Sequence, residues 1–173
     1  MLSATVAQAA DKPKLVIYTY DAFAADWGPA PAVKKAFEPM CDCEVQFVTA
    51  DSSIGILRII QLEGASTKAD IALGLDTNLT DIAQKTGLFI EHKADISELN
   101  LPIRWTNPVF LPFDYGYFSF VYDSEKIATA PTSFDELLAM PEDFKIVIQD
   151  PRSSTPGLGL LLWVRQIYGN KAP

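Results

Sequence analysis

The sequence predicts an α/β protein with a parallel-rich sheet and helices on both faces. Two observations lead to the α/β prediction. Short apolar runs alternate along the chain with longer segments of helical periodicity, and these segments begin at cap residues and end at glycine. Strands that alternate with helices pair in parallel, because each helix returns the chain to the same end of the sheet. The 173 residues, 49% of them hydrophobic, suit one domain, or one and a half of a larger protein.

Three pairs of strand and helix are expected in the first half of the chain. The run "KLVIYTY" is typical of a buried strand. Ser52 is an expected N-cap, and Gly64 and Gly87 follow the second and third helices as stop signals. The expected strands are 14–20, 43–49 and 69–75, and the expected helices are 30–40, 52–64 and 77–87.

A second β/α unit is expected to begin after about residue 115. It opens with a long aromatic stretch, and a capping box of Ser133 and Glu136 starts its first helix. The expected elements are an extended segment 110–123, a helix 133–140, a strand 144–150 and a helix 154–169. A sheet with so few strands would expose its apolar faces, so we expect the chain to lack a C-terminal half.

Charge and composition exclude several classes of partner. The net charge is −8 and no basic patch is visible, so nucleic acid is not expected as a partner. An acidic protein rich in aromatic residues suits a neutral or cationic ligand better. No stretch after the N-terminus reaches the roughly 20 apolar residues of a membrane span.

The N-terminus "MLSATVAQAA" is interpreted as the remnant of an export signal. Ala7 and Ala9 have the spacing of a signal-peptidase site, which would start the mature chain at Ala10. A basic region is missing and the apolar run is short, so a flexible N-terminus is the alternative. We assign residues 1–9 to the signal remnant.

The two cysteines, Cys41 and Cys43, flank a single residue between a helix and a strand. They lack partners for a zinc site, because the only histidine is His92 and no second cysteine pair exists. A tight disulfide and two half-buried thiols are both compatible with the spacing. We predict the disulfide for the exported protein.

Polar and aromatic side chains follow three of the expected strands, where ligands bind in open parallel sheets. Tyr20 and Trp27 follow the first strand, and the segment Asp51, Ser52 and Ser53 follows the second. The segment 149–157 follows the strand at 144–150. We expect these three points to converge on one cleft. The alternatives are structural: the aromatics could pack in the core or plug a loop, and the serines could only cap a helix.

The stretch "SSTPGLG" is the most specific candidate site. Ser154 or Thr155 caps a helix, Pro156 opens it, and Gly157 would let a ligand approach the backbone. Such a helix start attracts a phosphate or carboxylate. It is neither a Walker loop nor a complete dinucleotide fingerprint.

Catalysis has little support in the sequence. His92 has no serine or cysteine arranged near it as a nucleophile, and no metal site or cofactor is predicted. The one enzymatic route would use Cys41 or Cys43 as the nucleophile.

Four stretches together resemble the periplasmic thiamine-binding proteins of bacterial ABC transporters. They are "VIYTYDAFAADWGPAPAVKKAFE", "KADIALGLDTNLTDIAQKTGLF", "PFDYGYFSFVYD" and "QDPRSSTPGLGLLLWVRQIYG". The likeness runs from about Lys14 to Gly169, and the Cys-x-Cys pair, "FDYGYF" and "STPGLG" occur in the family's order.

The resemblance implies a type II periplasmic binding fold, in which two α/β lobes close on thiamine and its phosphate esters. Residues 10–113 would be lobe 1 and residues 114–173 the start of lobe 2. The phosphate would meet Ser52 and Ser53 on one side and Ser154 and Thr155 on the other. The family usually has an acidic residue and glycine at the first place, whereas Asp51 here lies one position earlier. Tyr20 and Trp27 would flank the cationic ligand.

The predicted function is therefore a solute-binding protein, not an enzyme. It would capture thiamine, thiamine monophosphate and thiamine diphosphate in the periplasm and deliver them to the permease and ATPase of an ABC importer. The alternatives are a binding protein for another small solute such as iron or a polyamine, a thiamine-degrading transferase of the same fold, and an inactive truncated fragment.

Overall fold

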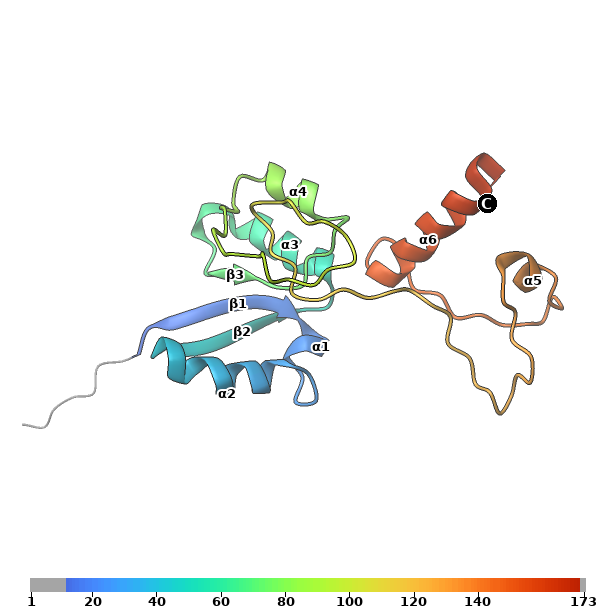
Figure 1. Cartoon of the computed structure of the whole chain (residues 1–173), viewed down its shortest axis with the longest axis horizontal. Coiled ribbons are helices and arrows are strands. Elements are labelled where there is room, and N and C mark those ends of the chain that lie inside the picture. The colour runs from blue at the N-terminus through green and yellow to red at the C-terminus, as the bar shows by residue number, and fades with distance from the viewer. Residues whose placement is uncertain (1–11, 172–173) are drawn as a thin grey trace, which may run out of the picture. The chain divides into compact units, whose positions relative to one another are not determined.

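The computed structural model describes residues 12–171, so the predicted signal remnant lies outside the described residues. The chain divides into two compact units (Figure 1). The first unit holds the chain up to Asn100 together with Arg104–Leu111, and the second holds Leu101–Ile103 and the chain from Pro112. Within residues 12–171 no helix combines the length and the apolar character needed to cross a membrane.

The first unit is built on a parallel sheet of three strands in the order β2-β1-β3. The central strand β1 (Lys14–Tyr20) pairs along its whole length with β2 (Glu44–Ala50), from Lys14 opposite Glu44 to Tyr20 opposite Ala50. The α/β class and the parallel sheet predicted from the sequence are confirmed.

The strand β3 (Ile71–Ala72) is shorter than the predicted 69–75. At the preceding residue, Asp70, a side chain takes the place of a backbone acceptor in the ladder with β1. Oδ2 of Asp70 accepts from the backbone N of Val16 at 2.8 Å. The backbone N of Asp70 donates to the O of Val16 at 2.9 Å. Beyond Ala72, Gly74 turns the chain out of the extended conformation with a φ of 102°.

Alternate residues of β1 point to opposite faces of the sheet, and each face has its own core. Ile17 packs with Cys43 and Val45 on the side of α2 (Ala30–Cys41). Tyr18 packs with Ile56 and Ile60 of α3 (Ser53–Glu63) on the other. Figure 1 shows α2 and α3 on opposite sides of the strands. A parallel strand covered on both faces is apolar almost throughout, as β1 is.

Smaller elements complete the first unit. A third cluster, in which Leu57 meets Leu79 and Ala83, packs α4 (Thr80–Lys85) against α3. The remaining elements of this unit are α1 (Asp21–Ala24) and the 3-10 turn η1 (Gly64–Ser66). The helix predicted over 77–87 starts late, because the side chain of Asp76 accepts from the backbone N of Asn78 and holds a turn there.

The second unit contains α5 (Phe134–Leu138), α6 (Thr155–Tyr168) and the 3-10 turn η2 (Gly169–Lys171). Ser133 caps α5 by accepting from the backbone N of Glu136 at 3.1 Å, as the capping-box pattern predicts. The strand predicted over 144–150 is wrong, since residues 112–171 hold no strand. A strand exists only where a neighbour completes its ladder, and the described part of this unit supplies none.

The phenol of Tyr18 anchors α3 to the sheet and gives a test of the core. Its Oη donates to both carboxylate oxygens of Glu63 at 3.0 Å, and burial together with this carboxylate raises the pKa of Tyr18. We expect Tyr18→Phe to lower the free energy of unfolding by about 1 kcal/mol in urea titrations. Because the folded-state pKa is raised, this contribution is complete below about pH 10 and is lost as the pH rises through that pKa.

Tyr168→Phe is the matched control, because the exposed Oη of Tyr168 also donates to a carboxylate, that of Asp135, at 2.6 Å. We expect a smaller loss for this variant, since water can replace the partner. Equal losses for the two variants would contradict a buried anchor at Tyr18.

Candidate functional site

The carboxyl edge of the first unit brings two of the predicted segments together. Tyr20 and Ala50 end β1 and β2 as register partners. The segment that begins at Asp51 therefore leaves the sheet beside the segment that begins at Asp21. Tyr20 and Asp51 to Ser53 thus lie at one edge, as the strand assignment predicts.

The start of α3 is held by its own side chains. The Oγ of Ser52 accepts from the backbone N of Gly55 at 3.2 Å and donates to Oδ1 of Asp51 at 2.8 Å. A Cβ at Gly55 would lie 2.6 Å from the same Oδ1, so the carboxylate lies directly over the first turn. Ser52 is thus the N-cap, and Ser53 occupies the first helical position. A carboxylate near a helix N-terminus is favourable, and it occupies the place that an anionic ligand would take.

Tyr20 is half-buried and belongs to the edge of the core. It packs against the cluster of Tyr18, Ile56 and Ile60, and its ring meets Phe23 edge-on at 6.0 Å between centroids. A Cβ at Gly74 would lie 2.5 Å from Cδ1 of Tyr20. The ring therefore lies flush against the backbone at Gly74. Sequence reasoning missed Gly74, although a glycine that interrupts an apolar run signals a close approach.

Trp27 lies in the loop between α1 and α2. Its side chain is 81% exposed, which rules out the alternative of a buried loop plug. The loop turns tightly here, because the backbone N of Gly28 donates to the O of Ala25 at 2.8 Å. An exposed indole in a tight loop is available for stacking with a planar ligand.

The start of α6 in the second unit repeats the arrangement at α3. The Oγ of Ser154 accepts from the backbone N of Gly157 at 3.3 Å and donates to the side chain of Gln149. Thr155 takes the first helical position and Pro156 the next. Both helices therefore begin with serine as cap and glycine three residues later, preceded by a turn that contains an aspartate.

Gly157 has a role different from the one expected. A Cβ there would lie 2.4 Å from the backbone O of Gln149, so the close approach is made by the chain's own peptide group. The preceding turn is braced by Arg152, whose guanidinium and backbone N bind the carboxylate of Asp150. These hydrogen bonds lower the pKa of Asp150 to about 2, which keeps the carboxylate ionised near the helix start.

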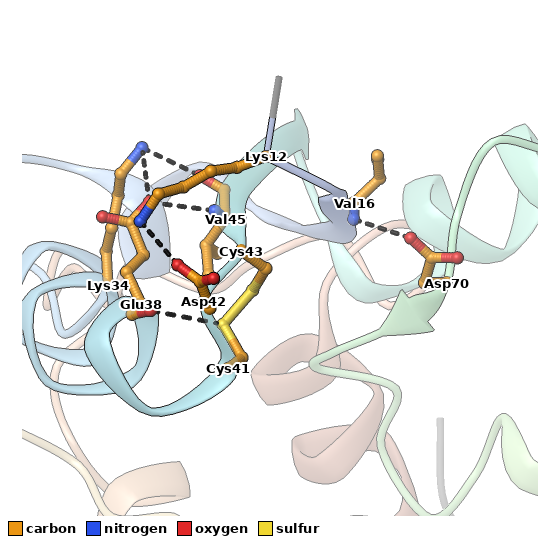
Figure 2. The surroundings of a disulfide bond; sticks show 9 residues. All are labelled: Lys12, Val16, Lys34, Glu38, Cys41, Asp42, Cys43, Val45 and Asp70. Atoms are coloured by element: carbon orange, nitrogen blue, oxygen red, sulfur yellow. Dashed lines mark hydrogen bonds and ion pairs between the residues drawn. A yellow bond between two sulfur atoms is a disulfide. The ribbon is translucent and has the colours of Figure 1, made fainter. Parts of the chain in front are cut away.

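Cys41 and Cys43 form a disulfide with an S–S distance of 2.05 Å, one of the two alternatives that the spacing allows. Figure 2 shows its surroundings at the amino end of the sheet. Asp42 between the cysteines pairs with Lys12 at 2.9 Å. Seven residues of strand separate this end from the carboxyl edge, which is about 20 Å. The disulfide therefore stabilises a corner far from Tyr20 and Asp51.

The helix α2 reaches the same corner with two side chains. Oε1 of Glu38 accepts from the backbone N of Val45 at 2.9 Å, and Nζ of Lys34 donates to the O of Val45 at 2.8 Å (Figure 2). The hydrogen bond from Val45, with the charge of Lys34, lowers the pKa of Glu38. The backbone N–H and C=O of Val45, a residue of the edge strand β2, are therefore both bound by side chains of α2.

His92 lies in a loop in which its Nδ1 accepts from the backbone N of Ala94 at 2.9 Å. This contact is local and gives the imidazole a structural role. Within residues 12–171 no group of three or more histidine, cysteine, aspartate or glutamate side chains could hold a metal ion.

A parallel sheet with helices on both faces and a capped helix at its carboxyl edge defines the first unit as an α/β fold with a parallel sheet. A solved structure titled "Periplasmic thiamin binding protein" matches the chain with a TM-score of 0.90 and 48% identity. The match covers 99% of this chain and 54% of that chain.

Curated relatives give the same result at the level of sequence. The proteins named "Thiamine-binding periplasmic protein" from Escherichia coli (strain K12) and Salmonella typhimurium (strain LT2) are 51% and 49% identical, over 94% and 100% of this chain. The protein of that name from Haemophilus influenzae is 41% identical over 96% of this chain. The chain spans about half the length of these relatives, 50% to 53%. No protein-family model matches it.

The chain is thus related, in sequence and in fold, to the thiamine-binding periplasmic proteins, and the resemblance inferred from its motifs is confirmed. The residues assigned to the ligand stay predictions. The structure brings Tyr20, Asp51, Ser52 and Ser53 to one edge of the first unit, and Ser154 and Thr155 start a helix of the second.

Gly74 offers a test of the position of Tyr20. We expect Gly74→Ala to lower the free energy of unfolding through two contributions. Backbone strain costs about 1–3 kcal/mol, and displacement of the Tyr20 ring by the new Cβ adds a further loss. In a Tyr20→Ala background the second contribution disappears, which chemical denaturation of the double-mutant cycle measures.

Gly87→Ala provides the control, because Gly87 has a φ of 69° and a Cβ added there would meet nothing within 4 Å. The free energy of unfolding of this variant should fall only by the cost of placing alanine in the left-handed conformation, about 1–2 kcal/mol, in either background. If Tyr20→Ala left the cost of Gly74→Ala unchanged, the ring would not be held by this glycine.

Proposed function

We propose that this chain is a solute-binding protein that captures thiamine and its phosphate esters in the periplasm and delivers them to the permease and ATPase of an ABC importer. The observation that carries the proposal is the likeness to thiamine-binding periplasmic proteins, at about 50% identity over nearly all of this chain. The two units would correspond to lobe 1 and to the start of lobe 2.

The chemistry of the carboxyl edge supports a cationic aromatic ligand. Thiamine carries a permanent positive charge on an aromatic ring. Trp27 is exposed and Tyr20 half-exposed, and stacking a cation on such a ring contributes about 0.5–2 kcal/mol. The carboxylate of Asp51 at the same edge and the net charge of −8 also favour a cation.

The phosphate esters would use the helix starts. At the start of α6 the hydroxyls of Ser154 and Thr155 are candidate donors to phosphate oxygens. Pro156 has no N–H and the backbone N of Gly157 donates to Ser154, so the hydroxyls rather than the backbone would contribute most of the contact. At α3 the carboxylate of Asp51 covers the first turn, so Ser52 and Ser53 could meet a phosphate only after Asp51 turns aside. We therefore assign phosphate binding mainly to Ser154 and Thr155, and we assign a smaller contribution to Ser52 and Ser53.

A role in binding fits the chain better than catalysis. The relatives are named for binding, and the thiamine-degrading alternative needs a free cysteine as nucleophile. Cys41 and Cys43 are joined in a disulfide at the amino end of the sheet, remote from the carboxyl edge. No feature of the described residues favours iron or a polyamine over thiamine.

Calorimetric titration with thiamine tests the proposal directly. We expect saturable binding at one site, at least about tenfold weaker than that of the longer Escherichia coli relative, which corresponds to about 1.4 kcal/mol. The same protein incubated with thiamine and a nucleophilic amine should leave the thiamine intact. Absence of any heat of binding, or loss of thiamine in the second experiment, would contradict a thiamine-binding role.

The hydroxyls at the start of α6 are tested by comparing two ligands. We expect Ser154→Ala combined with Thr155→Ala to weaken the binding of thiamine monophosphate by about 1.5–3 kcal/mol, because charge-assisted hydrogen bonds to the phosphate are lost. Free thiamine should lose less. Ser133→Ala removes the cap of another helix of the same unit and should change neither affinity. Equal losses for both ligands would mean that Ser154 and Thr155 only cap the helix.

A further inference from the structure

The last turn of α2 has a sequence that does not favour a helix end. Pro39 lies inside the helix and has no N–H to donate to the carbonyl four residues earlier. Glu38 puts a negative charge in the last turn, where the helix dipole favours a positive one. The C-cap is Asp42, which has the left-handed conformation (φ 49°, ψ 38°) that glycine adopts at less cost. Contacts outside the helix must therefore hold this turn.

The disulfide is the covalent contact at this turn. It joins Cys41, the last residue of α2, to Cys43, the residue before β2. Cys43 is buried and packs with Ile17 and Val45 in the core. Cys41 is half-buried and is the more accessible of the two sulfur-bearing residues. The bond thus ties the end of α2 to a side chain that the core already fixes (Figure 2).

The contacts that depend on the position of this turn converge on Val45. Val45 is 1% exposed, and its backbone N and O are bound by Glu38 and Lys34 at 2.9 and 2.8 Å. Both side chains come from the last three turns of α2, so the bonds exist only while this end of the helix lies against β2. The hydrogen bond from Val45 is also the main cause of the lowered pKa of Glu38. This carboxyl therefore reports on the contact.

The ion pair at the same corner is a weak restraint by comparison. Nζ of Lys12 lies 2.9 Å from Oδ1 of Asp42, but the two side chains are 60% and 88% exposed. Water and salt screen such a pair, so its contribution to stability is small. The disulfide is therefore the contact whose loss would free the end of α2.

We propose that the Cys41–Cys43 disulfide is a redox-sensitive lock, whose reduction releases Glu38 and Lys34 from Val45 while the rest of the first unit stays folded. With the disulfide formed, the last turn of α2 is held against β2 and the peptide groups of Val45 are covered. With the disulfide reduced, the unfavourable local sequence of this turn decides, and the turn frays. The corner is thus completed in an oxidising compartment such as the periplasm, for which the relatives are named.

Opening the lock needs a dithiol reductant, which supplies two electrons and two protons. One thiolate of the reductant attacks Sγ of Cys41, the S–S bond breaks, and Cys43 leaves as a thiolate that takes up a proton. The second thiolate of the reductant then attacks the mixed disulfide and releases Cys41. The reductant ends as a disulfide and the chain as two thiols.

Amide hydrogen exchange of the whole chain, followed by NMR before and after addition of dithiothreitol, tests the proposal without any ligand. We expect the amide of Val45 to exchange at least about tenfold faster after reduction, because its acceptor on Glu38 is lost. The amides of β1 should exchange as before. The pKa of Glu38, followed by carbon-13 NMR of its carboxyl, should rise toward its usual range. Reoxidation with oxidised glutathione should restore both values.

Three variants separate the lock from other effects at the corner. Cys41→Ser breaks the disulfide and keeps Cys43 in the core, so Val45 should exchange as in the reduced chain. Glu38→Ala removes the acceptor itself, so dithiothreitol should change the exchange of Val45 in this variant by less than about twofold. Lys12→Ala is the matched control, because it removes the ion pair but leaves the disulfide and the acceptor in place. It should exchange as the unaltered chain does.

Four results would overturn the proposal. Val45 could keep its protection in Cys41→Ser, or after a reduction that alkylation of both thiols shows to be complete, which would mean that core packing alone holds α2. The amides of β1 could lose protection together with Val45, which would make the disulfide a support of the whole unit. The effects of reduction and of Glu38→Ala could multiply, or Lys12→Ala could act as strongly as reduction.

Discussion

The pairing of β1 with its neighbours is the constraint on which the first unit depends. A strand in the middle of a parallel sheet must satisfy its peptide groups on both edges and its side chains on both faces. β1 does so with β2, with β3 and the side chain of Asp70, and with α2 and α3 on the two faces. Since its register fixes where β1 and β2 end, it also fixes which side chains meet at the carboxyl edge.

At the two serine-capped helix starts, the capping hydrogen bonds limit which groups remain to bind a ligand. At α3 and α6 the cap hydroxyl is already a donor within the chain, to Asp51 and to Gln149. A ligand phosphate would have to compete with these acceptors. The two starts differ in charge, because Asp51 lies over α3, whereas Asp150 is paired with Arg152 before α6. An anion is therefore opposed less at α6 than at α3.

The sequence predicted elements that depend on local pattern and missed those that depend on a partner. The strand at 14–20, the caps Ser52 and Ser133, and the helix before Gly169 follow from periodicity and capping, and the structure has them. The predicted strand 144–150 failed because an apolar run contains no information about whether a neighbouring strand is present. At the site, the strand ends were predictable, but the placement of Tyr20 against Gly74 depends on tertiary contact. The Cys-x-Cys spacing allowed both redox states.

The contacts of α2 with Val45 have a consequence for how the sheet can grow. β2 is an edge strand, and an edge strand is a template on which another chain can continue the ladder. At Val45 both peptide groups are bound by charged side chains, Glu38 and Lys34. An incoming strand would have to break two charge-assisted hydrogen bonds before forming its own. These two hydrogen bonds therefore raise the free-energy cost of adding a strand at the β2 edge, independently of any ligand.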